Sequence, residues 1–300
     1  MSAITLHNLN TLEPLDQEWV REQLSNYPFI RIDGVTNSRT LGSYPVKITS
    51  SEARAEDRFE GRVTRPRQLF RSAEISGITD EGKTQLKELG ITKVFDLRSD
   101  TEMEKYNTPV PQIEGVEIVR VPVFEKEDYS PEVMARRFQL YASGKTEAFM
   151  ELYSQILDNG GPAFAEIIKH VRDKPDEGCL FHCTAGKDRT AVIAAILLSL
   201  AGVNDDVIAS DYELTRIGRE PARTLILKRL AKEPIFAENK DAALNMLTSR
   251  RETMLAFLDL LRNKYGGAEG YMQKFCSLSA EDVQEIRHNL TADTKSCFLR

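Results

Sequence analysis

The sequence predicts an α/β fold in which a mostly parallel sheet is flanked by helices and followed by a helical C-terminal part. Three observations lead to this prediction. Short β-branched or apolar segments alternate with helical patterns over residues 69–202, which is the order of parallel strands joined by helices. Residues 203–300 show only helical patterns. With 41% hydrophobic and 29% charged residues, the composition is that of an ordinary globular protein.

The first 68 residues are expected to form a helix and a loop-rich extension. An amphipathic pattern predicts a short helix over residues 14–25. Residues 27–71 are interrupted by Gly and Pro, and their charged middle has no clear periodicity. Length alone suggests roughly two domains, but α/β folds of this size often form one. We expect a single domain over residues 1–300.

Capping signals and periodicity define the elements of the core. Thr79 is a suitable N-cap, Asp80 and Glu81 suit the positive end of a helix dipole, and Gly90 is a typical stop. Strands are expected over residues 68–71, 91–97, 117–123 and 178–182. Helices are expected over residues 79–89, 131–142, 146–172 and 190–201. The last of these helices is apolar nearly all round and is therefore expected to be buried.

The C-terminal third is helical by pattern. The expected helices cover residues 205–217, 222–231, 240–264 and 280–290. Ser279 and Asp282 have the spacing of a capping box before the last helix.

Charge and hydropathy argue against several classes of protein. The net charge of -6, from 40 basic and 46 acidic residues, argues against general nucleic-acid binding. The longest apolar run, residues 191–203, is shorter than the roughly 18 residues of a membrane span. The N-terminus lacks the features of a secretory signal, and four cysteines do not suggest a disulfide scaffold. We expect a cytoplasmic protein with no integral membrane segment.

The most informative segment is the loop from Cys183 to Arg189, between a short apolar strand and the buried helix. A loop that enters a helix N-terminus presents unpaired N–H donors and a positive dipole end. Because the thiolate is the reactive form of cysteine, the field that binds a phosphate would also activate Cys183. The pattern predicts a cysteine-dependent phosphatase in which Cys183 is the nucleophile and forms a phosphocysteine.

Other residues of the motif have expected roles. The planar guanidinium of Arg189 can hold two phosphate oxygens and stabilise charge during transfer. The Thr190 hydroxyl would bond the Cys183 sulfur and favour its departure, and His182 would orient the loop. Gly186 permits a tight curl of the backbone. The residues expected to bind the phosphate are Thr184, Ala185, Gly186, Lys187 and Thr190.

The general acid is left open between two carboxylates. Asp188, inside the loop, is the first choice. Asp128 follows the second strand, where many cysteine phosphatases place a mobile acid. Asp96 is expected to pair with an arginine rather than to act in catalysis.

Four further charged residues have expected roles, and for three of them an alternative is kept. Lys187 either favours multiply phosphorylated substrates or is a solvated surface lysine. Arg39 and Arg98 are candidates for a basic rim, although a buried ion pair is favoured for Arg98. Asp211 is expected to brace the loop, the alternative being an ordinary solvent-facing carboxylate.

Two other motif interpretations fail on residue identity. A nucleotide-binding Gly-x4-Gly-Lys-Ser/Thr loop would need Gly at position 181 and Ser or Thr at position 188. The sequence has Phe181 and Asp188 there. A zinc site at Cys179, His182 and Cys183 would lack a second cluster of ligands. We expect neither a metal nor a cofactor.

The segment His182-Cys-Thr-Ala-Gly-Lys-Asp-Arg-Thr190 resembles the active-site signature of the atypical tyrosine-phosphatase-like family of bacteria and fungi. Phe95-Asp-Leu-Arg-Ser-Asp-Thr-Glu102 resembles the family's Asp-Leu-Arg-x3-Glu motif, and Tyr265-Gly-Gly-x3-Tyr271 its C-terminal pattern. The chain departs from the family at Ser38 and Thr40, where relatives usually carry Phe and Asp. The resemblance implies phosphotyrosine proteins or phosphoinositides as substrates.

Three rival functions are kept beside a tyrosine phosphatase. The first is a phosphatase for phosphoinositides or small phosphate esters. The second is a pseudophosphatase that binds phosphorylated partners without turnover, which the intact Cys183, Asp188 and Arg189 argue against. The third is a sulfur-transferring or arsenate-reducing enzyme, which the Lys-Asp-Arg-Thr end of the loop disfavours.

Overall fold

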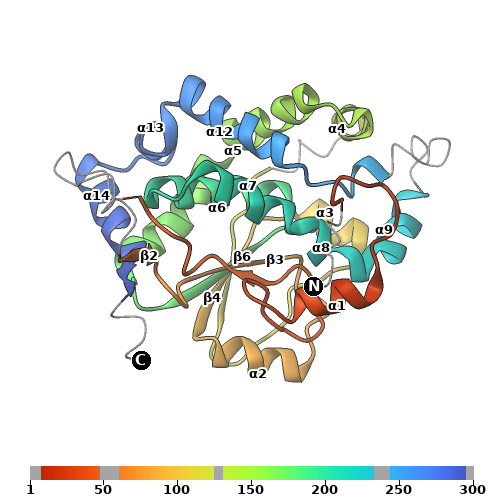
Figure 1. The fold of residues 1–300 in the computed structure, drawn as a ribbon, viewed down its shortest axis with the longest axis horizontal. Helices are drawn as coiled ribbons and strands as arrows, with labels where there is room; N and C mark the ends of the chain where they lie inside the picture. The colour runs from red at the N-terminus through yellow and green to blue at the C-terminus, as the bar shows by residue number, and fades with distance from the viewer. Residues whose placement is uncertain (1–7, 48–60, 125–130, 233–243, 295–300) are drawn as a thin grey trace, which may run out of the picture.

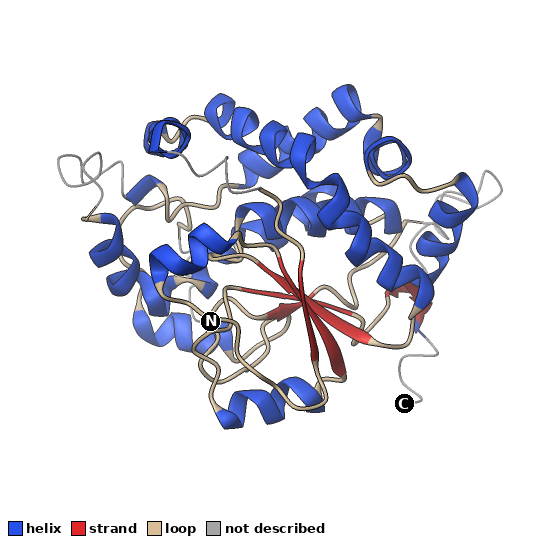
Figure 2. Ribbon diagram, turned by 180° about the vertical axis from the view of Figure 1, so that it is seen from behind, coloured by secondary structure: helices blue, strands red, loops and turns tan. Residues whose placement is uncertain are grey.

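A five-stranded sheet lies between α2 (Asp80–Glu88) on one face and a thick layer of helices on the other (Figure 1, Figure 2). The computed structural model describes residues 8–47, 61–124, 131–232 and 244–294. The strand order is β1-β3-β6-β4-β5, in which β1 is antiparallel to β3 and all other neighbours are parallel. These strands are β1 (Arg39–Thr40), β3 (Leu69–Ser72), β6 (Gly178–His182), β4 (Ile91–Asp96) and β5 (Glu117–Arg120). The predicted α/β fold with a mostly parallel sheet is confirmed.

Most predicted helices are present near their expected bounds. Thr79 caps α2, and Ser279 and Asp282 form the capping box before α14. Helices before the central strand are α1 (Gln17–Leu24), α2, α3 (Asp100–Tyr106), α4 (Pro131–Ser143) and α5 (Thr146–Asp173). Those after it are α6 (Asp188–Ala201), α7 (Asp205–Glu213), α8 (Thr215–Gly218), the 3-10 turn Glu220–Ala222, α9 (Arg223–Leu230), α12 (Arg251–Tyr265), α13 (Gly267–Phe275) and α14 (Ala280–Asn289).

Some elements differ from the sequence-based expectation. Residues 246–250 are not helical, so the helix expected over 240–264 is interrupted and α12 begins at Arg251. The carbonyls of Met246 and Thr248 instead accept hydrogen bonds from the ammonium group of Lys187. Helices α3 and α13 were not predicted. Neither was a small antiparallel sheet of β2 (Arg62–Thr64) and β7 (Thr291–Asp293).

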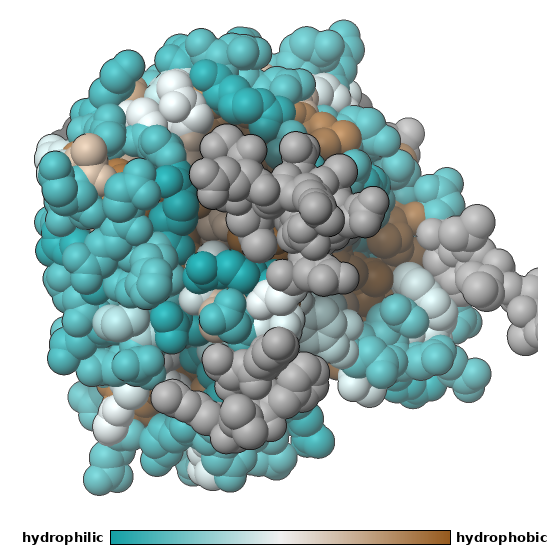
Figure 3. Space-filling view, turned by 60° about the vertical axis from the view of Figure 1, so that its left-hand side comes forward, coloured by the Kyte–Doolittle hydropathy of each residue, from teal (hydrophilic) through white to brown (hydrophobic). Residues whose placement is uncertain are grey.

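The main hydrophobic core lies between the sheet and the thick helical layer. Helix α6 runs through this core and is buried along nearly its whole length. A smaller core between the sheet and α2 includes Phe70, Val94 and Leu180. Figure 3 shows that hydrophilic side chains predominate on the face it presents, with hydrophobic side chains in a few patches. Among the described helices, none combines the length and apolar character that crossing a membrane requires.

Candidate active site

Cys183 lies directly after the central strand β6, where a tight loop leads into α6. The carboxyl ends of parallel strands lie at one edge of a sheet, where ligand sites of α/β proteins form. Cys183 is 2% exposed. The Thr190 hydroxyl donates a hydrogen bond to Cys183 Sγ at 3.2 Å. The structure thus brings this sulfur and the first turn of α6 into direct contact.

The peptide carbonyls of the loop are held from its outer side. Nδ2 of Asn37 donates to the carbonyls of Ala185 and Gly186 at 3.2 and 3.1 Å. The guanidinium of Arg71 also donates to the Gly186 carbonyl, at 2.9 Å. In a trans peptide the carbonyl and the N–H point in opposite directions. The N–H groups of Gly186 and Lys187 therefore face the inner side of the loop.

The same orientation extends to the start of the loop. The backbone N–H of Glu74 donates to the Thr184 carbonyl at 3.3 Å, which turns the N–H of Ala185 inward as well. Gly186 has a φ of +60°, and a Cβ there would lie 2.2 Å from the Ser72 carbonyl oxygen. No larger residue fits this close approach. Successive inward N–H groups of this kind make a concave anion-binding surface.

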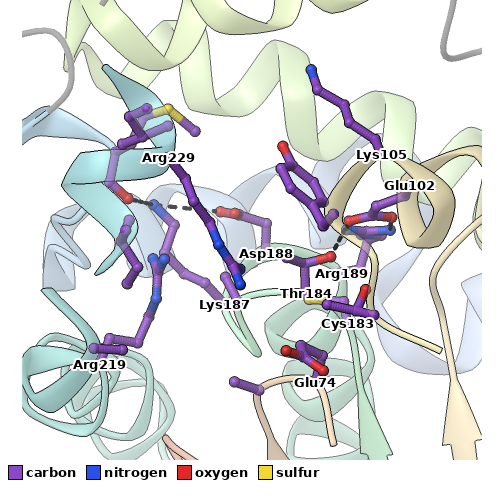
Figure 4. Close-up of a pocket in the computed structure, with 18 of the residues that line it drawn as sticks. Glu74, Glu102, Lys105, Cys183, Thr184, Lys187, Asp188, Arg189, Arg219 and Arg229 are labelled. Atoms are coloured by element: carbon purple, nitrogen blue, oxygen red, sulfur yellow. Dashed lines mark hydrogen bonds and ion pairs between the residues drawn. The ribbon is translucent and has the colours of Figure 1, made fainter. Parts of the chain in front are cut away.

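Arg189 is oriented by a carboxylate from a neighbouring helix. Its two terminal nitrogens donate to Oε2 and Oε1 of Glu102, each at 2.6 Å. The Thr184 hydroxyl donates to the same carboxylate. Glu102 belongs to α3, so the helix that follows the Asp-Leu-Arg motif fixes the guanidinium beside the loop. Figure 4 shows Arg189, Glu102, Thr184 and Cys183 on one side of the pocket.

Asp211 lies behind the loop in a buried network of charges. Its two carboxylate oxygens accept hydrogen bonds from Arg39 at 2.8 Å and from Arg71 at 2.6 Å. Tyr44 donates to the same carboxylate at 3.1 Å. Burial alone would raise the pKa of Asp211, but the charges of Arg39 and Arg71 outweigh it and hold this pKa below its usual range. Through Arg71 the network reaches the Gly186 carbonyl.

Asp188 begins α6, and its carboxylate lines the cavity. The hydroxyl of Tyr153 donates to Asp188 Oδ1 at 2.9 Å. The hydroxyl oxygens of Tyr153 and Tyr212 lie 2.7 Å apart and share a hydrogen bond. Burial, with a further contribution from the charge of Asp188, raises the pKa of Tyr153 well above its usual value, so this phenol stays a donor. A pair of buried phenols therefore orients Asp188.

His182 and Asp96 are buried beneath the loop. Asp96 accepts hydrogen bonds from Nε and a terminal nitrogen of Arg98 at 2.9 and 2.8 Å. The preferred interpretation of Asp96 and Arg98 as a buried ion pair is confirmed. Burial lowers the pKa of His182, which favours a neutral ring at pH 7. Its Nδ1 lies 3.3 Å from the Cys183 carbonyl oxygen.

A cavity of about 1140 Å³ opens over the loop. Its walls include Cys183, Asp188 and Arg189, together with side chains of α3, α4 and α9. Apolar and aromatic side chains also line this cavity: Phe124, Phe138, Tyr141, Ile226, Leu230 and Met246. The part of the chain that the structure describes brings together no three His, Cys, Asp or Glu side chains able to hold a metal ion.

Comparison with known proteins decides the family. A family model described as the tyrosine phosphatase family matches residues 30–292. The chain belongs to this family. A tyrosine-protein phosphatase of Nostoc commune is 28% identical over 224 residues, which cover 74% of each chain. The triple specificity protein phosphatase of Mycobacterium tuberculosis is 27% identical over 251 residues, which cover 74% of this chain and 90% of that relative. The protein is therefore a phosphatase, and the resemblance stated from the sequence is confirmed.

Within this tyrosine phosphatase fold, the structure excludes one sequence-based interpretation for each of two cations. Lys187 is 1% exposed, so it is not a solvated surface lysine. Its ammonium donates to the carbonyls of Met246 and Thr248 at 3.0 and 3.1 Å, and burial lowers its pKa to about 8. The interpretation of Arg39 as part of a basic rim is wrong, because Arg39 is 0% exposed and pairs with Asp211.

Sequence reasoning missed the partners that orient the phosphatase loop. Glu102 stands in a family motif that by itself assigns it no role, and local patterns alone do not point to Asn37, Arg71 or Tyr153. The family motif around Glu102 was the available signal, whereas the other contacts depend on long-range packing. The alternative acid, Asp128, lies outside the described residues.

Proposed function

We propose that this phosphatase hydrolyses phosphate monoesters through a phosphocysteine at Cys183, with phosphotyrosine proteins as substrates. The main support is the loop geometry, in which carbonyls bond outward and N–H groups face the Cys183 side. Such N–H groups bind a phosphate and stabilise a thiolate through the same partial positive charge. The sulfur that accepts a hydrogen bond from Thr190 would therefore lie against a bound phosphate.

The first step transfers the phosphoryl group to sulfur. Cys183 Sγ attacks phosphorus, the Sγ–P bond forms, and the bond from phosphorus to the leaving oxygen breaks. The leaving oxygen takes a proton from Asp188. Arg189, with its plane set by Glu102, and the loop N–H groups would stabilise the charge on the transferring oxygens.

The second step returns the enzyme to its starting state. Water attacks phosphorus, loses a proton to the Asp188 carboxylate, and the Sγ–P bond breaks as inorganic phosphate forms. The Thr190 hydroxyl, 3.2 Å from Sγ, would stabilise the departing thiolate. Asp211 contributes as a positioning residue, because it fixes the Arg71 side chain that holds the Gly186 carbonyl.

The assignment of Asp188 as general acid is tested by pH–rate profiles. A general acid must be protonated to act, so kcat of the wild type should fall at high pH as this acid loses its proton. A variant without the acid should not show this fall. We expect Asp188→Asn to lose this basic limb, and Asp128→Asn to retain it. The reverse pattern would transfer the role to Asp128.

The substrate class is proposed from the cavity. Its aromatic and apolar side chains suit an aryl phosphate, whose ring would carry the phosphate in as far as Cys183. The second candidate is a phosphoinositide or small phosphate ester. The name of the Mycobacterium tuberculosis relative, a triple specificity protein phosphatase, indicates that that protein acts on more than one class of substrate. A phosphate-release screen across phosphotyrosine peptides, phosphoinositides and small esters separates these candidates.

Replacement of the nucleophile tests the mechanism itself. Cys183→Ser should lower kcat for an aryl phosphate by about four orders of magnitude or more, because the alkoxide is far harder to form than the thiolate. Circular dichroism should show an unchanged fold. Turnover by Cys183→Ser near the wild-type rate would refute the phosphocysteine. A wild-type protein that binds phosphopeptides but does not turn them over would instead be a pseudophosphatase.

We further propose that the chain acts in the cytoplasm, as one domain over residues 1–300, without a metal or cofactor. Activity that survives exhaustive chelation would support the last point. Activity lost on chelation and restored by a divalent cation would contradict it.

A further inference from the structure

Two arginines in the cavity wall have no carboxylate partner in the described part of the chain. Arg219 directly follows α8, Arg229 lies on α9, and both line the cavity. No ion pair joins either guanidinium to an Asp or Glu among residues 8–47, 61–124, 131–232 and 244–294. The arginines that contact or flank the loop are all paired: Arg39, Arg71 and Arg189.

Both side chains are partly buried. Burial lowers the pKa of Arg219, while the negative charges of Asp188 and Cys183 act in the opposite direction. A partly buried guanidinium that forms no ion pair carries a desolvation cost. An anion that enters the cavity would recover this cost. The reaction at Cys183 gives Arg219 and Arg229 no part, so their presence in the wall calls for another role.

The two arginines lie apart from the reacting sulfur. Figure 4 shows Arg219 and Arg229 on one side of Asp188, and Cys183 and Arg189 on the other. The Arg229 guanidinium lies 5.9 Å from the centre of the Tyr106 ring, a distance typical of a cation–π contact. Because Cys183, Arg219 and Arg229 line the same cavity, one ligand can contact all three.

We propose that Arg219 and Arg229 form a second anion-binding subsite, which takes a second phosphate group of a substrate whose first phosphate lies at Cys183. The proposal rests on the proposed function, since it assumes that phosphate is transferred at Cys183. A phosphate monoester carries about -1.5 to -2 charges at pH 7. The two positive charges of Arg219 and Arg229 match the charge of a phosphate monoester better than the single charge of a carboxylate. Each guanidinium can also bind two phosphate oxygens.

The test uses phenyl phosphates that carry an alkyl chain at the para position. The chain ends in a methyl, a carboxylate or a phosphate group, and its length is varied. Release of the phenol is followed by absorbance, so that only cleavage at the aryl phosphate is counted. At the best length, the compound with two phosphates should have a kcat/KM about tenfold or more above that of the methyl compound.

Variants test whether the preference for the compound with two phosphates depends on the two arginines. Arg219→Gln and Arg229→Gln should each lower the ratio of kcat/KM for the two compounds, and the Lys variants should lower it less. Lys228→Gln is the matched control, because Lys228 is exposed on the same helix as Arg229 and does not line the cavity. If Arg219→Gln fails to fold, Arg229→Gln, whose side chain is only partly buried, tests the subsite alone.

The outcomes separate the subsite from the mechanism. Equal kcat/KM for the methyl and phosphate compounds at every length, with turnover that requires Cys183, would overturn the subsite alone. An equal gain for the carboxylate compound would overturn the assignment to a second phosphate. Turnover of the methyl compound by Cys183→Ser would instead overturn the proposed function.

Discussion

The two sides of the loop after β6 hold their arginines in opposite ways. Behind the loop, Arg39 and Arg71 are buried and pair with Asp211. On the cavity side, Arg219 and Arg229 face the open space without a carboxylate partner among the described residues. Pairing fixes a guanidinium as part of the structure, whereas a guanidinium without a carboxylate remains able to bind an anion from solution. The difference separates cations that shape the loop from cations that can bind a ligand.

The largest effect is expected from removing the carboxylate behind the loop. Asp211→Asn would leave two buried guanidiniums without a counter-charge and should cost about 3–5 kcal/mol of unfolding free energy. Urea denaturation measures this loss. The matched control is Asp206→Asn on the same helix, because Asp206 pairs with Arg251 at 2.8 Å on the surface. It should cost less than about 1 kcal/mol. Equal losses for the two variants would contradict the structural role of the buried network.

Acid should remove the same stabilisation from the wild type. The pKa of Asp211 is raised by burial but lowered more by Arg39 and Arg71, so it lies below its unfolded value. The stabilisation is therefore complete above the unfolded value near ~3.9 and is lost as pH falls through the lower folded value. The difference in unfolding free energy between wild type and Asp211→Asn should be constant at neutral pH and shrink below about pH 4. A difference that grows on acidification would contradict this sign.

On the cavity side, the carboxylate that orients Arg189 should matter for rate. Glu102→Gln keeps the shape of the side chain but loses the charge that binds both terminal nitrogens of Arg189. We expect kcat/KM for an aryl phosphate to fall about 10- to 100-fold. Glu104→Gln, an exposed change on the same helix, should leave it near the wild-type value. Equal rates for the two variants would show that Arg189 does not need this partner.

A smaller effect is expected from the phenol that contacts Asp188. Tyr153→Phe removes one hydrogen bond to Asp188 and should lower kcat by roughly 2- to 10-fold, with little change in KM. Tyr265→Phe is the control, since Tyr265 donates to Asp158 at 2.7 Å outside the cavity. A change in KM alone would indicate that Tyr153 acts on binding rather than on proton transfer.

Local patterns predicted the sheet, most helices and the loop at Cys183, because these features depend on neighbouring residues. Thr79 and Ser279 cap helices as expected, and the strand, loop and helix around Cys183 follow one another in the predicted order. The buried positions and hydrogen-bond partners of Lys187 and Arg39 could not be predicted, because these partners lie far away along the chain. Thr248 and Asp211, respectively, supply those partners. Residues 246–250 likewise leave the helical pattern where tertiary contacts with Lys187 prevail over local propensity.

The most direct test of the account is to trap the reaction at the sulfur. Wild-type enzyme is mixed with an aryl phosphate, quenched rapidly, digested and examined by mass spectrometry. We expect a phosphoryl group on the peptide that contains Cys183, formed during the initial burst of phenol release and lost as inorganic phosphate appears. Steady turnover with no adduct at Cys183, or an adduct on another residue, would contradict it.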